Sequence, residues 1–134
     1  MSLKDKIKFI PRKKIVDERG WFLKVINGKE ENLPKYTGEV YLTFATPKEI
    51  KGGHYHLLAD EWFTLIQGVC KVELIDINTN EKMELITSEE EVITFYVPRE
   101  VAHRFVNMSN KNGFLLLAYT NQLYSPEDTI NYKF

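Results

Sequence analysis

The chain has 134 residues and a formal net charge of −1, with 18 lysines and arginines against 19 aspartates and glutamates. This length allows one hydrophobic core without disulfides or a structural metal, so we expect a single domain over residues 1–134. The balanced charge and the lack of basic clusters mixed with aromatic residues argue against nucleic acid as a partner. The sequence shows no signal peptide and no apolar stretch of membrane-spanning length, which predicts a cytoplasmic protein without a membrane partner.

Turn residues divide the sequence into short segments that have the alternation of strands and their β-branched and aromatic residues. We expect strands at residues 6–10, 14–16, 21–26, 39–45, 54–56, 62–67, 69–77, 82–87, 92–97, 103–107 and 114–120. A turn at 17–20, a loop at 27–37 and a hairpin loop at 78–81 separate some of them. Only 57–66 and 87–93 could form helices, and neither has a cap at each end. Many short strands with almost no helix predict an antiparallel sandwich or barrel.

Cys70 is the one cysteine, and it lies in the alternating run 69–74. A chain with a single cysteine forms no internal disulfide, which suits a reducing compartment. In such a strand we expect Cys70 to be a small apolar core residue rather than a reactive thiol.

The three histidines of the chain fall in two apolar runs. His54 and His56 are two residues apart, so in a strand both side chains leave the same face. His103 lies in a second run, which follows Pro98. If the two runs pair, all three imidazoles converge on one point, with Glu61 as a nearby carboxylate.

Two segments resemble the two sequence motifs of the cupin superfamily of small jelly-roll barrels. These are residues 54–68, with His-x-His, a glutamate and a glycine, and residues 98–107, with Pro-x-Glu-x-x-His-x-x-x-Asn. The resemblance implies an all-β fold, an antiparallel double-stranded β-helix that forms a jelly-roll cupin barrel. It also implies four candidate metal ligands, which are His54, His56, Glu61 and His103. Glu100 stands where the second motif usually carries glycine.

Three neutral imidazoles and one carboxylate suit Zn²⁺, Mn²⁺, Fe²⁺ or Ni²⁺ and leave positions open for water or a substrate oxygen. Among these metals we expect zinc first, because one family that the chain resembles binds zinc. The alternative is a site without metal, in which the histidines act as acid, base and hydrogen-bonding groups. Glu61 has an alternative of its own, because beside Asp60 it could be a solvated carboxylate on a charged turn.

A second resemblance covers nearly the whole chain and points to the RmlC-like cupins of nucleotide-sugar metabolism. Residues 17–22 are similar to the Asp-x-Arg-Gly-x-Phe opening of the dTDP-4-dehydrorhamnose 3,5-epimerases, and residues 51–55 to their Arg-Gly-Leu-His-Tyr. Residues 97–103 resemble their Val-Pro-x-x-x-Ala-His, and residues 124–128 their Tyr-x-Pro-Glu segment. The four segments occur in the same order as in these epimerases.

Two relatives within this branch resemble the chain still more. The sugar-nucleotide 3,4-ketoisomerases carry Gly-x-His-x-His, and the zinc-binding cupin domain of capsular-polysaccharide reductase/epimerases carries Gly-x-His-Tyr-His with a following glutamate. The chain departs from the 3,5-epimerases at two positions. Their catalytic tyrosine falls on Ala118, one residue before Tyr119, and their arginine is Lys51. A single epimerisation or a keto shift is therefore better supported than a double epimerisation.

The resemblance implies an isomerase or epimerase that acts on a nucleotide-linked 4-keto-6-deoxysugar in deoxysugar or surface-polysaccharide biosynthesis. Such a reaction removes a proton next to the ketone, which requires a base and a group that stabilises the enolate charge. His54 is the candidate base, because an imidazole titrates near neutral pH. Lys51, or a metal held by the other ligands, would stabilise the enolate. The candidate catalytic residues are His54, Lys51, His56, Tyr55 and Tyr119.

A coordinated imidazole cannot also accept a proton, so His54 is either the base or a metal ligand. If it is a ligand, another group must be the base, with Tyr55, Tyr41 or Tyr119 as candidate proton donors. The nucleotide would be bound by Arg19 at the diphosphate and by Trp21 or Phe22 stacked on the base. The full set of candidate substrate-binding residues is Arg19, Trp21, Phe22, Tyr41, Asn121 and Tyr124.

In the resembling family the segment around Arg19 reaches into a neighbouring subunit, which implies a homodimer. Trp21 and Phe22 face opposite sides of a strand, so we expect one of them in the core. We expect the same of at least one of Trp62 and Phe63.

Two other functions stay open. One is a metal-dependent cupin that acts on another small molecule, and the other is a non-catalytic sugar-nucleotide-binding module.

Overall fold

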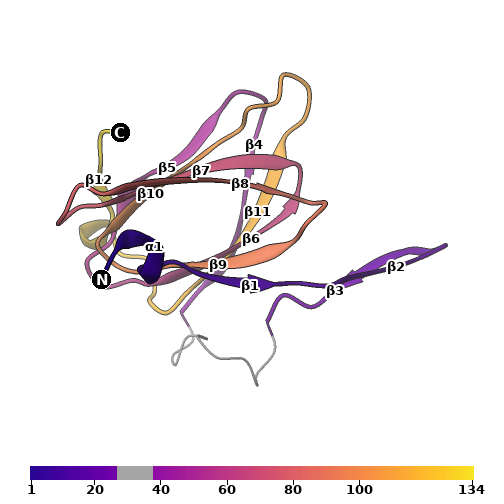
Figure 1. The fold of residues 1–134 in the computed structure, drawn as a ribbon, viewed down its shortest axis with the longest axis horizontal. Coiled ribbons are helices and arrows are strands. Elements are labelled where there is room, and N and C mark those ends of the chain that lie inside the picture. The colour runs from indigo at the N-terminus through magenta and orange to yellow at the C-terminus, as the bar shows by residue number, and fades with distance from the viewer. Residues whose placement is uncertain (27–37) are drawn as a thin grey trace.

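The computed structural model describes residues 1–26 and 38–134, and these form a sandwich of two five-stranded antiparallel sheets (Figure 1). The first sheet contains, in spatial order, β1 (Lys8–Pro11), β9 (Ile93–Val97), β6 (Glu61–Gln67), β11 (Phe114–Thr120) and β4 (Val40–Ala45). The second contains β12 (Ile130–Asn131), β5 (Ile50–Tyr55), β10 (Val101–Val106), β7 (Val69–Asp76) and β8 (Lys82–Ser88). The predicted loop at 27–37 lies outside the described residues.

The helices of the described chain are short. The two segments that could have been helical are not, because 61–66 belongs to β6 and 87–93 spans the end of β8 and the start of β9. The structure instead forms α1 (Leu3–Lys6) and the 3₁₀ helix η1 (Pro126–Asp128), which are too short to show a helical period in the sequence. No helix among the described residues is long and apolar enough to cross a membrane.

The core fills the space between the two sheets. Strand β11 alternates between buried and half-buried residues along its length, as a strand with one face on a core should. Trp62 and Phe63 are both buried, so the prediction for this pair is confirmed. Cys70 is also fully buried, and its burial raises the pKa of the thiol to about 12. The expectation that Cys70 is a core residue is therefore confirmed.

A separate two-stranded ribbon of β2 (Lys14–Asp17) and β3 (Gly20–Leu23) extends away from the sandwich (Figure 1). Trp21 and Phe22 are 53% and 58% exposed, so the expectation that one of them lies in the core is wrong. The reason is that the ribbon pairs with neither five-stranded sheet. Lys14 places its Nζ 4.7 Å from the centroid of the Trp21 ring, a cation–π contact.

A β-bulge in β5 sets the direction of the side chains that precede and follow it. Pairing with β10 passes from His103 opposite His54 to Arg104 opposite Gly52, so Gly53 is the extra residue. Both glycines have positive φ angles, +81° for Gly52 and +87° for Gly53, which is left-handed backbone that favours glycine. A Cβ on Gly52 would also lie 2.9 Å from the carbonyl oxygen of His103.

Glu100 lies in the turn between β9 and β10 and adopts the left-handed conformation, with φ +66°. Its backbone N–H donates to the carbonyl oxygen of His56 at 2.7 Å. Glycine, the residue that the second cupin motif usually carries here, adopts this conformation more readily than glutamate does.

Candidate functional site

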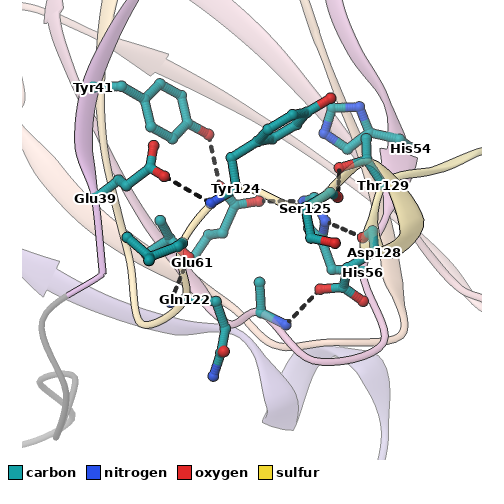
Figure 2. A pocket seen from close by; sticks show the side chains of 13 residues that line it. Glu39, Tyr41, His54, His56, Glu61, Gln122, Tyr124, Ser125, Asp128 and Thr129 are labelled. Atoms are coloured by element: carbon teal, nitrogen blue, oxygen red, sulfur yellow. Dashed lines mark hydrogen bonds and ion pairs between the residues drawn. The ribbon is translucent and has the colours of Figure 1, made fainter.

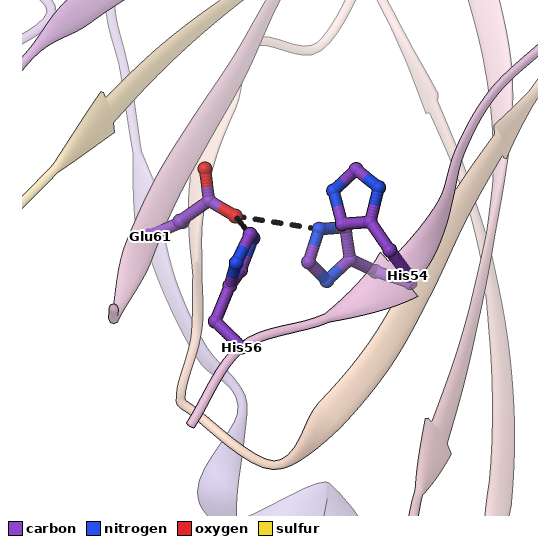
Figure 3. A group of neighbouring side chains, drawn as sticks. His54, His56 and Glu61 are labelled. Carbon is purple, nitrogen blue, oxygen red and sulfur yellow. Dashed lines mark ion pairs between the residues drawn. The ribbon is translucent and has the colours of Figure 1, made fainter. Parts of the chain in front are cut away.

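The three histidines converge inside the sandwich, as the sequence predicted. Figure 3 shows His54 and His56 with Glu61 beside them. His54 on β5 is paired directly with His103 on β10, and their ring centroids are 4.9 Å apart. The ring of His56 lies 5.0 Å from that of His54 and 5.6 Å from that of His103. Glu61 lies beside them at the start of β6. The three histidines and Glu61 offer one ligand atom each, and these four atoms all lie within 4.8 Å of one another.

Glu61 is buried, with an exposed fraction of 4%, so the alternative of a solvated carboxylate is wrong. The hydroxyl of Tyr41 donates to Glu61 Oε2 at 2.6 Å. Glu61 Oε1 lies 2.8 Å from His56 Nε2 and 3.3 Å from His103 Nε2. Burial acts to raise the pKa of Glu61, but the two imidazoles outweigh it and hold this pKa well below its usual range. Burial and the negative charge of Glu61 raise the pKa of Tyr41, which keeps its hydroxyl a donor.

Backbone carbonyls fix the orientation of two of the rings. His56 Nδ1 lies 2.7 Å from the carbonyl oxygen of Asp128, and His103 Nδ1 lies 3.2 Å from that of Val101. A carbonyl only accepts, so each Nδ1 carries the hydrogen. In a neutral ring, Nε2 then presents its lone pair on the side of Glu61.

A positively charged atom is needed between the His56 ring and the Glu61 carboxylate. His56 Nε2 and Glu61 Oε1 are buried and 2.8 Å apart, yet neither atom makes an aligned hydrogen bond. Two lone pairs at this distance repel each other unless a proton or a metal ion lies between them. The donor set and the carbonyl contacts behind the rings therefore fit a divalent metal such as zinc.

The His54 and His56 rings have opposite pKa shifts. Burial, followed by the electrostatic effects of the neighbouring His103 and His56 rings, lowers the pKa of His54 to about 4, against an opposing effect of Glu61. His54 is therefore neutral at pH 7 and can accept a proton. Burial also acts to lower the pKa of His56, but the adjacent Glu61 carboxylate outweighs this effect, so the pKa of His56 is raised.

Two cavities meet at His54 and Tyr41, which line both of them. The larger has a volume of about 300 Å³ and is walled partly by the C-terminal segment, with Tyr124, Ser125 and Thr129 (Figure 2). No residue of its described lining is lysine or arginine. The smaller has a volume of about 200 Å³, and its lining includes Lys51.

The sequence matches one known family over most of its length. Residues 15–132 match the family model described as the polysaccharide biosynthesis C-terminal domain. The chain belongs to this family. None of the curated proteins matches the chain.

Three solved structures are similar in fold to this polysaccharide biosynthesis C-terminal domain. A dTDP sugar isomerase from Desulfovibrio desulfuricans G20 has a TM-score of 0.86 at 16% identity, covering 95% of this chain and 83% of its own. The dTDP-6-deoxy-D-glucose-3,5-epimerase of Legionella pneumophila Philadelphia 1 was solved with dTDP-4-keto-L-rhamnose. Its TM-score is 0.82 at 20% identity, and the match covers 95% of this chain and 72% of the epimerase chain. A mutant 3,4-ketoisomerase from Thermoanaerobacterium thermosaccharolyticum was solved with TDP-4-keto-6-deoxyglucose. Its TM-score is 0.76 at 21% identity, and the match covers 93% of this chain and 86% of the ketoisomerase chain. The predicted RmlC-like cupin fold, an antiparallel jelly roll, is confirmed.

Lys51, Tyr41 and Tyr124 are candidate site residues that line one or both of these cavities. Tyr124 lines the larger cavity and Lys51 the smaller. Lys51 and His54 are three residues apart, so in a regular strand they would face opposite sides. The extra residue Gly53 brings both of them to the same cavity.

Three candidate residues of the domain, Tyr55, Tyr119 and Asn121, line neither of these two cavities. Tyr55 falls between His54 and His56, so it leaves the opposite face of the strand, where its ring lies 6.3 Å from that of Tyr132. Tyr119 follows Ala118, which is buried in the core, and its ring lies 6.4 Å from that of Trp62.

Asn121 is the third of these residues. Its side chain is used by the protein itself, because Oδ1 accepts from the backbone N–H of Asp60 at 2.9 Å and Nδ2 donates to the Asp60 carboxylate at 3.2 Å. It holds the loop before β6 and does not line either cavity.

Arg19, Trp21 and Phe22 lie on the exposed ribbon of β2 and β3 and line neither cavity of their own chain. Arg19 makes an ion pair with the carboxylate of Asp17, at 2.6 Å. Their role in binding a nucleotide stays a prediction that requires a second subunit.

Sequence reasoning missed two carboxylates at the larger cavity, Glu39 and Asp128. Glu39 Oε1 accepts from the backbone N–H of Tyr124 at 2.7 Å and so ties the start of β4 to the C-terminal segment. Asp128 is buried at the end of η1, and it contacts a loop about 70 residues earlier in the chain. The only local signal was its place in the Tyr-Ser-Pro-Glu-Asp segment, which did not indicate a contact with a histidine.

Proposed function

We propose that this domain is an isomerase, an epimerase or 3,4-ketoisomerase that acts on a nucleotide-linked 4-keto-6-deoxysugar for surface-polysaccharide or deoxysugar biosynthesis. The observation that carries the proposal is the buried cluster of three imidazoles and a carboxylate at the junction of two cavities. The family match and the ligands of two structural neighbours support the same substrate class.

His54 is the proposed base. Its lowered pKa keeps the ring neutral at pH 7, and it lines both cavities, so a sugar carbon in either cavity can approach it. The proton removed from C3, next to the ketone, passes to His54. In a keto shift His54 delivers it to C4 while the hydroxyl proton of O3 moves to O4, so that the ketone passes from C4 to C3; in an epimerisation C3 instead takes a proton from water on the opposite face. Lys51 lines the smaller cavity beside His54, and its ammonium group stabilises the enolate oxygen.

A divalent metal, with zinc as the first choice, is the proposed cofactor. His56, Glu61 and His103 would hold it, since Glu61 Oε1 is within 3.3 Å of Nε2 of both rings. When bound, such an ion acts as a Lewis acid that polarises the ketone and stabilises the enolate charge. His54 then serves as base only if it is not itself a ligand.

A single keto shift or a single epimerisation is the proposed outcome. Ala118 occupies the position of the catalytic tyrosine of the 3,5-epimerases and is fully buried, while Tyr119 points away from the cavities. The acid that the 3,5-epimerases place at this position is therefore missing from this strand. A keto shift needs no acid there, and a single epimerisation would take its proton from water on the far side of the sugar.

We further propose a homodimer in which the exposed ribbon of one subunit reaches the cavities of the other. The large apolar side chains Ile15, Val16, Trp21 and Phe22 are exposed in the single chain, which is typical of a surface that another protein covers. Arg19 would then bind the diphosphate of the partner's substrate. The cytoplasmic location expected from the sequence stays a prediction.

The test is solvent exchange with TDP-4-keto-6-deoxyglucose in D₂O, followed by proton NMR. The proposal predicts that the C3 hydrogen signal is lost in the presence of the protein, with deuterium entering at C3 in an epimerisation or at C4 in a keto shift, and that His54→Asn abolishes this change. Tyr55→Phe is the matched control, because this ring lies outside both cavities, and it should leave the exchange rate unchanged. Absence of exchange with TDP-, UDP-, GDP- and CDP-linked 4-keto sugars would reject the proposed function.

A second candidate is a metal-dependent cupin that acts on another small molecule. The close, unaligned contact between His56 Nε2 and Glu61 Oε1 favours a metal in either case. Elemental analysis of the purified protein, together with a thermal-shift screen of nucleotides, separates the two functions. Stoichiometric metal with no shift from any nucleotide would favour the second candidate, and neither metal nor exchange would favour a non-catalytic binding module.

A further inference from the structure

Asp128 contacts both the His56 ring and the loop that joins His56 to Glu61. Its carboxylate is buried and accepts three consecutive backbone N–H groups of this loop. Oδ1 accepts from Leu57 at 2.7 Å and from Leu58 at 3.0 Å, and Oδ2 accepts from Ala59 at 3.1 Å. Hydrogen bonds to an ionised carboxylate are among the stronger ones in proteins, so this loop is held firmly.

The carbonyl oxygen of the same residue lies 2.7 Å from His56 Nδ1. A single residue, 71 positions from Leu57, therefore fixes both the path of the loop and the hydrogen on the ring. Figure 2 shows Asp128 and His56 together on one side of the larger cavity, with Thr129 beside them.

We propose that Asp128 is the positioning residue of this site, which holds His56 with Nε2 facing Glu61 and sets the distance between these two side chains. The carboxylate anchors residue 128 against the loop, and the anchored carbonyl then selects the ring orientation. Outer contacts of this kind orient a metal-binding histidine, and their loss costs about 10- to 100-fold in metal affinity. The inference rests on the proposed metal site and deepens it, but the ring tautomer of His56 can be measured with neither metal nor substrate.

The variants are Asp128→Ala, which removes all three carboxylate hydrogen bonds, and Asp128→Asn. The asparagine can still accept with Oδ1 from Leu57 and Leu58, but its amide group faces the N–H of Ala59. The matched control is Glu127→Gln, since Glu127 is the exposed neighbour whose carboxylate accepts only from the Ser125 hydroxyl among the hydrogen bonds described.

The first readout is the ring tautomer of His56 in the metal-free protein, measured by long-range ¹H–¹⁵N NMR at a pH where the ring is neutral. The parent protein and Glu127→Gln should show mainly the tautomer with the hydrogen on Nδ1, because the Asp128 carbonyl at 2.7 Å from Nδ1 competes with the Glu61 carboxylate at 2.8 Å from Nε2. Asp128→Ala should show a mixture of both, and Asp128→Asn should be intermediate. This readout separates positioning from a purely structural role, which would lower the melting temperature and leave the tautomer unchanged.

The second readout is the affinity for Zn²⁺ alone, measured by competition with a chromophoric chelator. We expect a loss of about 10- to 100-fold for Asp128→Ala, a smaller loss for Asp128→Asn and none for Glu127→Gln. If Asp128→Ala does not fold, Asp128→Asn alone decides. A single Nδ1–H tautomer in the Asp128 variants, or a Zn²⁺ affinity within about twofold of the parent, would overturn the proposal. Failure of the proposed enzyme activity would leave the tautomer result intact, so the two are distinguishable.

Discussion

The lowered pKa of His54 predicts a specific loss of stability in acid. The unfolded chain binds the His54 proton near its usual pKa of 6.5, whereas the folded protein binds it only near pH 4. The contribution of His54 to stability is therefore fully present above pH 6.5 and is lost as the pH falls from 6.5 towards 4. His56 acts in the opposite direction. Its pKa is raised, so its contribution is present at low pH and is lost as the pH rises through the raised value.

The magnitude follows from the size of the shift. Each pKa unit corresponds to about 1.4 kcal/mol, so a shift from 6.5 to about 4 has an upper limit of roughly 3 kcal/mol. The ring is only partly buried, and solvent screening reduces this to an expected loss of about 2 kcal/mol. His54→Asn removes the titrating imidazole and retains all carboxylates and the other two histidines. The difference between the unfolding free energies of the two proteins therefore isolates the effect of His54.

The assay is urea unfolding of the parent protein and His54→Asn at several pH values between about 7.5 and about 4.5, with EDTA present to remove metal. The free energy of unfolding of the parent should fall by about 2 kcal/mol more than that of the variant over this range. Two curves that stay parallel within about 0.5 kcal/mol would refute the assigned environment of His54.

Three other predictions test separate parts of the structure. Glu100→Gly should relieve the left-handed backbone and stabilise the protein by about 0.5–1 kcal/mol, seen as a melting temperature about 2–4 °C higher; a lower melting temperature would contradict it. Tyr41→Phe removes the donor to buried Glu61 Oε2 and should destabilise the protein by about 1–3 kcal/mol in urea unfolding, and no measurable change would show that this hydrogen bond is absent. Cys70 is buried and its pKa is raised to about 12, so iodoacetamide should modify it only after denaturation; rapid labelling of the native protein, seen by mass spectrometry, would disprove its burial.

The fold was predictable because its strands carry their own local signal. Alternation along segments such as 69–74 predicts which side chains face the core, and pairing then follows from the short turns. The helices α1 and η1 were missed because three or four residues contain no helical period. The exposed ribbon was misjudged at Trp21 and Phe22, because alternation shows that two faces exist and does not show whether another layer covers either of them.

The site was predicted in part. The pairing of His54 with His103 followed from two separate apolar runs, and it holds in the structure. Tyr119 was misplaced because its assignment came from a position in a related motif, whereas the alternation of β11 puts Ala118 inside and Tyr119 outside. Asp128 was missed because its contacts join residues about 70 positions apart, and no local pattern records such a contact.

The most direct test of the central claim uses the fact that the chain has only three histidines. Each imidazole gives one Hε1–Cε1 signal in a ¹H–¹³C spectrum of the untagged protein, and TDP-4-keto-6-deoxyglucose can be added stepwise to the His54→Asn variant, in which turnover is blocked. The shared site predicts that the signals of His56 and His103 shift together along one saturable curve with a single Kd. Signals that stay in place when the sugar nucleotide is in large excess would show that the cluster is not where this substrate binds.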